Sequence, residues 1–161
     1  INLPNEVLMV GNGAFSGCIS LSTVFLPNSI TSIGQMAFYK CENLTDIKIP
    51  SKVISIGAQT FSGSGLRSVQ FSSGITSISK GAFFDCKGLA RVIIPESVKS
   101  IGRGAFSRCA NLESVTFLGD APSASSDAFA GTSPTIYYMA GTEGWSEQFS
   151  GLNTEETTSQ P

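Results

Sequence analysis

Apolar positions recur along this chain with a period of 22 or 23 residues. One phenylalanine marks each period, and the six are Phe15, Phe38, Phe61, Phe83, Phe106 and Phe129. A leucine follows each of the first five, and apolar residues come three and five positions after that leucine. A unit of this length cannot enclose a core alone. The period therefore predicts a solenoid in which stacked coils bury one another's apolar rows.

Each coil is expected to contain two strands. The segment L-x-x-V-x-I/F is rich in β-branched residues and alternates at its end, which predicts a strand paired in parallel with its copies. Pro27, Pro50 and Pro95 follow this strand, where a missing N–H does least harm to the ladder. The segment V-x-S-I-G predicts a shorter second strand and a bend. The segment A-F-x-x-C is too short for a stable helix and predicts a helical or 3-10 turn.

These elements predict a β-rich solenoid of about six coils over residues 1–133, with one parallel sheet along one face and short strands and turns on the other. The first unit begins in mid-repeat, so we expect further coils upstream in the natural protein. An open end of the core would favour end-to-end self-association. Residues 152–161 are polar and predict a disordered tail or linker.

The third unit is one residue shorter than the others. It reads FSGSGL over residues 61–66, where the second unit reads FYKCENL, and Ser64 stands in the place of a cysteine. Because the chain rounds a surface corner here, the loss shortens a turn and leaves both core anchors in their layers. Two interpretations remain open. The deletion has no functional meaning, or it bends or narrows the solenoid at this coil.

The full unit L-x-x-V-x-I-P-x-x-V-x-S-I-G-x-x-A-F-x-x-C resembles the leucine-rich repeats of BspA-like (Treponema-type) surface proteins over about residues 1–133. Residues 134–151 are similar to the segment that closes the last repeat in that family, with Trp145 and Phe149 as plugs of the open core. The resemblance implies a leucine-rich repeat solenoid at a cell surface or outside the cell. It implies binding to other proteins, matrix or host cells, or a role as a stalk.

Composition and charge exclude several kinds of partner. Ten basic and twelve acidic residues give a net charge of −2, and no run of lysine or arginine forms the basic face that nucleic acid or anionic lipid requires. No stretch of the sequence is long and apolar enough to predict insertion into a membrane. The 41% hydrophobic content supports one domain with a substantial core.

Catalytic chemistry is not expected. The chain has no histidine, which removes serine–histidine and cysteine–histidine pairs and a common zinc ligand. Its carboxylates fall in different coils, without the pairing that acid–base catalysis demands. We therefore predict no enzyme activity, no cofactor and no metal site.

Four cysteines, Cys18, Cys41, Cys86 and Cys109, each lie three residues after a repeat phenylalanine. They are expected to form a column beside the core as free, buried thiols. The alternative is two disulfides between neighbouring coils, Cys18 to Cys41 and Cys86 to Cys109. Asn43 begins an N-L-T glycosylation sequon, which would be idle in a bacterial protein.

The candidate binding surface is the outward face of the long sheet, because repeat proteins generally bind through such regular surfaces. Its residues flank the buried valine row and are Thr23, Phe25, Asp46, Lys48, Ser68, Gln70, Arg91, Ile93, Ser114 and Thr116. Phe25 and Ile93 are apolar among hydroxyls, and either anchor a partner or are ordinary surface residues. The leading hypothesis is a module that binds a protein, matrix or host component. The alternative is a spacer that projects another domain, and the mixed chemistry of this face favours binding.

Overall fold

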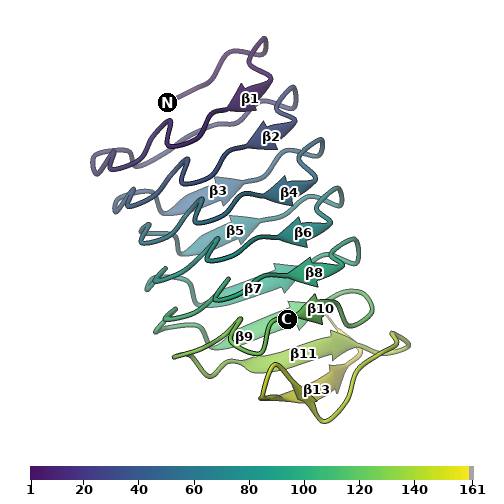
Figure 1. Ribbon diagram of the computed structural model, residues 1–161. Coiled ribbons are helices and arrows are strands. Elements are labelled where there is room, and N and C mark those ends of the chain that lie inside the picture. Colours follow the sequence, from purple (N-terminus) through teal and green to yellow (C-terminus); the bar gives the residue numbers. More distant parts are fainter. Residues whose placement is uncertain (160–161) are drawn as a thin grey trace.

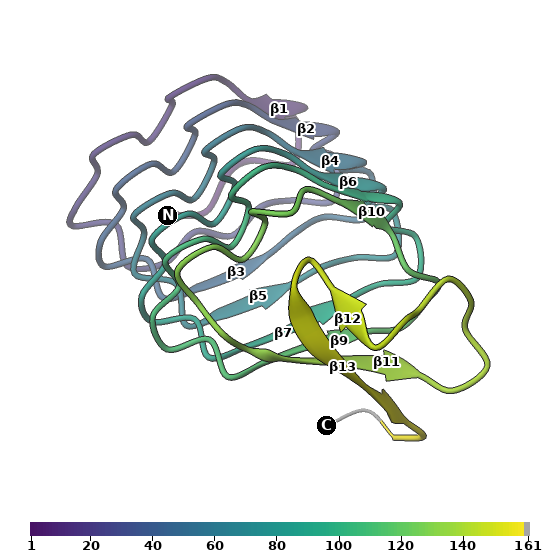
Figure 2. The same ribbon diagram turned by 60° about the horizontal axis from the view of Figure 1, so that its bottom comes forward.

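The computed structural model describes residues 1–159 as a β-solenoid of about seven turns. Its coils follow one another in sequence order from the N-terminal to the C-terminal end (Figure 1). Strands occupy two sides of the coils, and turns connect them (Figure 2). The predicted parallel solenoid is confirmed. It has one turn more than the six coils predicted, because strands near the C-terminus extend the stack.

One side carries a continuous parallel sheet of two-residue strands in the order β1-β2-β4-β6-β8-β10. These strands are β1 (Met9–Val10), β2 (Ser32–Ile33), β4 (Ser55–Ile56), β6 (Ser77–Ile78), β8 (Ser100–Ile101) and β10 (Ser123–Ala124). From β2 to β8, each strand exposes part of its serine and buries its isoleucine. This side corresponds to the predicted second strands.

The long sheet on the other side is divided. Strands β3 (Asp46–Lys48) and β5 (Ser68–Gln70) form one pair, and five strands form the order β12-β13-β11-β9-β7. The five are β7 (Arg91–Ile94), β9 (Ser114–Phe117), β11 (Thr135–Met139), β12 (Gln148–Phe149) and β13 (Leu152–Thr157). Among the residues that the structure describes, the first coil contributes to this side only a bridge between Asn2 and Phe25. Within residues 1–159, no strand pairing joins the first coil to β3, or β5 to β7. The single uninterrupted sheet that we expected is therefore wrong at these two places.

The six repeat phenylalanines lie in single file along the core. Neighbouring ring centroids are 5.2, 5.4, 5.3, 5.2 and 5.5 Å apart. Four of the five pairs are inclined by 3° to 7°, whereas Phe61 and Phe83 are inclined by 15°. That pair spans the shortened corner, so the rings are least parallel where the third unit is one residue short.

The segment around each phenylalanine is a run of hydrogen-bonded turns, and no described residue is helical. The predicted helical or 3-10 turn was therefore wrong. In the second coil, Tyr39 N–H donates to Met36 O, whereas the amides of Phe38 and Lys40 donate to the third coil. Met36 and Lys40 have left-handed φ values of 55° and 52°, which interrupts any helical path. A helix would retain these amides within the segment, but here they join two coils.

The C-terminal cap covers the last coil. Trp145 and Phe149 pack on Phe117, with ring centroids 4.9 and 5.2 Å away. Strand β13 pairs in parallel with β11 and antiparallel with β12, so residues 152–157 are not the disordered tail that we expected. Despite their polar sequence, these residues form a strand that pairs with the backbone N–H and C=O groups at the edge of β11. This strand also packs Leu152 against the core. The end of that expected tail, residues 160–161, lies outside the described residues.

Candidate functional site

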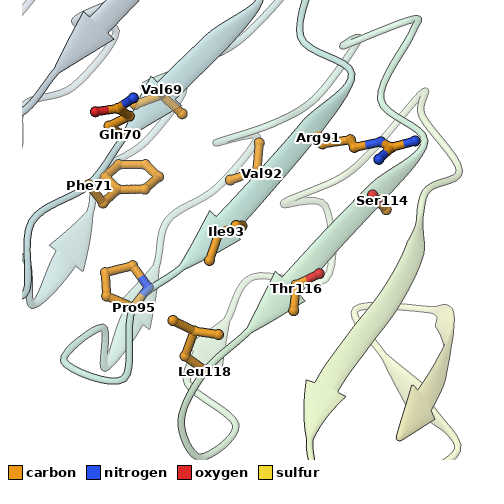
Figure 3. A pocket seen from close by; sticks show the side chains of 10 residues that line it. All are labelled: Val69, Gln70, Phe71, Arg91, Val92, Ile93, Pro95, Ser114, Thr116 and Leu118. Carbon is orange, nitrogen blue, oxygen red and sulfur yellow. The ribbon is translucent and has the colours of Figure 1, made fainter. Parts of the chain in front are cut away.

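Two hollows lie on the outward face of the long sheet, one at each interruption of its ladder. The first lies along the first coil, β3 and β5 and has a volume of about 400 Å³. The second lies along β5, β7 and β9 and has a volume of about 430 Å³ (Figure 3). Together they are lined by all ten residues that the sequence analysis selected. The predicted residues thus lie on one face but divide between two hollows, which share Gln70.

The first hollow combines an aromatic ring with opposite charges. It is lined by Thr23, Phe25, Asp46, Lys48, Ser68 and Gln70, and by three apolar residues. Phe25 is 64% exposed. Asp46 accepts hydrogen bonds from Ser68 Oγ at 2.7 Å and Thr45 Oγ1 at 2.8 Å. These two hydrogen bonds hold the pKa of Asp46 below its ordinary value, and the bond from Ser68 has the larger effect.

The second hollow has an apolar end and a charged end (Figure 3). Phe71, Ile93, Pro95 and Leu118 gather at one end, and Arg91 lies at the other. Phe71 is fixed by an edge contact with Phe83, whose ring centroid is 5.8 Å away. Arg91 is exposed and forms no ion pair within residues 1–159.

Thr116 departs from the prediction because its side chain is buried, with 1% exposed. In the strand register it lies between Ile93 of β7 and Tyr137 of β11. Larger side chains at both positions cover the short threonine, so alternation along a strand does not ensure exposure. Ser68 and Ser114 are partly exposed, and the other seven predicted residues are exposed.

Sequence reasoning missed the apolar lining of the second hollow, which includes Val69, Phe71, Val92, Pro95 and Leu118. Val69 of β5 and Val92 of β7 belong to the buried valine row, which the sequence analysis had assigned to the core alone. One signal was present in the sequence. Leu118 stands where four other units carry proline, at Pro4, Pro27, Pro50 and Pro95, so a leucine side chain follows the strand in place of a proline ring.

The model of the BspA type leucine-rich repeat region matches this chain in six copies, over residues 1–113 and 33–141. The chain belongs to the BspA-type leucine-rich repeat family. A leucine-rich repeat protein from Treponema pallidum has a similar structure, with 28% identity and a TM-score of 0.71. That match covers 88% of this chain and 73% of the treponemal one. No curated protein matches the chain in sequence.

Two further solved structures show the fold alone. A leucine-rich repeat protein from Bacteroides ovatus is 23% identical, with a TM-score of 0.55, and the match covers 86% of this chain and 48% of that one. The pneumococcal vaccine antigen PcpA is 17% identical, with a TM-score of 0.58, and the match covers 86% and 32% of the two chains. The chain thus spans less than half of these two proteins.

The cysteine column of this BspA-type solenoid is buried except at its first member. Cys41, Cys86 and Cys109 are fully buried free thiols, whereas Cys18 is exposed. Each buried Sγ donates to the carbonyl of a phenylalanine in the preceding coil, at 3.0 to 3.1 Å. Burial raises the pKa of Cys41 to about 11 and that of Cys86 to about 12.

These thiols are therefore protonated at neutral pH and are poor nucleophiles. Within residues 1–159, no group of three or more histidine, cysteine, aspartate or glutamate side chains is placed to hold a metal ion. The same residues contain no helix long and apolar enough to cross a membrane. The outward face of the long sheet presents exposed apolar side chains, hydroxyls, one amide and charges that have no ion-pair partner among residues 1–159.

Proposed function

We propose that this BspA-type repeat is a non-catalytic module that binds a protein at a cell surface or in the extracellular matrix through the outward face of its long sheet. The observation that carries the proposal is the pair of hollows on that face, lined by all ten predicted residues. A repeat solenoid presents such a face rigidly, because stacked coils fix the spacing of successive side chains.

The chemistry of the face supports a protein partner. Phe25 and Ile93 are 64% and 38% exposed, and each lies beside a hollow. Lys48 and Arg91 are exposed and have no acidic partner among residues 1–159. Aromatic residues and arginine are enriched where proteins bind one another. Membership of the BspA-type family supports the placement at a cell surface or outside the cell.

The test compares the binding of two variants to cultured epithelial cells and to immobilised fibronectin, laminin and collagen. The site variant carries F25S, K48S, R91S and I93S. The control variant also loses two exposed apolar and two exposed basic residues, outside both hollows, and carries L8S, I54S, K52S and K99S. We expect the site variant to lose binding at an almost unchanged melting temperature, and the control variant to bind as the wild type does.

Binding retained by the site variant would place the interface on another face of the solenoid. A wild-type protein that binds neither cells nor any of these matrix proteins would favour the spacer role. The melting temperature of each variant shows whether a loss of binding reflects a loss of folded protein.

A further inference from the structure

The third coil lies close to the second both before and after β5 in the sequence. Gly65 precedes this strand and Gly74 follows it. A Cβ atom on Gly65 would collide with the carbonyl oxygen of Glu42, and one on Gly74 would collide with that of Ser51. Both carbonyls belong to the second coil. At both positions, glycine lets the backbone of the third coil approach a carbonyl of the second coil.

The opposite edge of β5 faces β7 without strand pairing. The second hollow lies across this opening, and Val69 of β5 and Val92 of β7 contribute to its lining (Figure 3). Its volume of about 430 Å³ falls within the range of sites that bind ligands. The adjoining ladders, from β3 to β5 and from β7 to β9, are intact, so the opening is held between two paired units.

The two ends of the hollow differ in chemistry, because one is positively charged and the other is apolar. Arg91 has no ion-pair partner in the described part of the chain, and a guanidinium can bind a carboxylate through two parallel N–H···O bonds. Ile93, on the same face of β7, borders the apolar end. Residues two apart in a strand are about 6.6 Å apart, and side chains two apart in an extended peptide have the same spacing.

We propose that the opening between β5 and β7 binds an extended peptide of a partner protein, in which an acidic side chain lies two residues before an aromatic or aliphatic one. The carboxylate pairs with Arg91, and the apolar side chain contacts Ile93 and Phe71 at the other end. Gln70 lines the same hollow, and an amide can both donate and accept hydrogen bonds with a peptide backbone. This inference rests on the proposed function and specifies its partner.

The test is an amide chemical-shift titration of the whole chain with the capped peptide Ser-Asp-Thr-Phe-Ser. Three matched peptides serve as controls. One replaces the aspartate by asparagine, one replaces the phenylalanine by serine, and one exchanges the threonine and the phenylalanine to give Ser-Asp-Phe-Thr-Ser. We expect saturable shifts in β5 and β7 with the first peptide. The asparagine peptide should bind about tenfold more weakly, because it loses a charge-assisted bond. The exchanged peptide should also bind more weakly, since its two side chains point to opposite faces.

Variants of the protein distinguish binding at this hollow from non-specific electrostatic attraction of the acidic peptide. R91Q should weaken binding of the first peptide about tenfold. R67Q removes another exposed positive charge from outside the hollow and should leave binding unchanged. No shift in β5 or β7 at about 10 mM peptide, or equal binding by R91Q and the wild type, would overturn the inference.

The same experiments distinguish this inference from the proposed function. If the site variant loses binding to cells or matrix while the wild type ignores the peptide, the outward face binds a partner of other chemistry and only the inference fails. If the peptide binds in the opening but the wild type binds neither cells nor matrix proteins, the peptide site stands. The proposed adhesion then fails.

Discussion

Replacing Phe83 by alanine removes the most connected ring of the phenylalanine stack. Phe83 is fully buried and contacts Phe61 and Phe106 at centroid distances of 5.3 and 5.2 Å, and the edge of Phe71 at 5.8 Å. A buried Phe→Ala change costs about 3 to 5 kcal/mol. Three aromatic contacts, each worth about 0.5 to 1.5 kcal/mol, place F83A near the upper end of that range.

F15A is the matched control for this prediction. Phe15 is only partly buried and has one ring neighbour, Phe38, at 5.2 Å. Its loss should cost about 1 kcal/mol, because less apolar surface leaves water when it packs. Urea denaturation, followed by circular dichroism, gives the free energy of unfolding of each variant. F83A that costs no more than F15A would refute a core built on stacked rings.

Three further outcomes are expected. At pH 8, a thiol reagent should modify Cys18 rapidly and Cys41, Cys86 and Cys109 only after unfolding; equal rates for all four would contradict their burial. The folded-state pKa of Asp46 is lowered, so its stabilising bond to Ser68 is present above the ordinary pKa of about 3.9 and is lost as pH falls through the folded value. The stability difference between the wild type and S68A should therefore shrink below about pH 4 in urea titrations, and a difference independent of pH would contradict this account. Leu8 and Met9 are both 63% exposed on the first coil, so light scattering should show association at high concentration that L8E with M9E removes; a strict monomer would contradict it.

The periodic sequence predicted the core well because equivalent residues occupy equivalent core positions in every coil. The row from Phe15 to Phe129 came from spacing alone, and its rings stack as expected. The candidate face was also predictable, because alternation about the buried valine row separates inward from outward positions. All ten selected residues line a hollow on that face.

The failures came from features that lie outside a single repeat. Thr116 is buried by residues of two neighbouring coils, which one strand's alternation does not reveal. The break between β5 and β7 is a relation between two coils, which the sequence of one repeat does not reveal, although the missing residue marked the third coil. Residues 152–157 form a strand because an open sheet edge lies beside them, so their polar composition was misleading.

Nuclear Overhauser effects between the phenylalanine rings test the central claim most directly. With the aromatic side chains labelled and assigned, the account predicts ring contacts between all five neighbouring pairs from Phe15 to Phe129, since their centroids are 5.2 to 5.5 Å apart. It predicts none between rings two coils apart. A missing contact between Phe61 and Phe83, or contacts that skip a coil, would contradict the stacking on which the outward face and its two hollows depend.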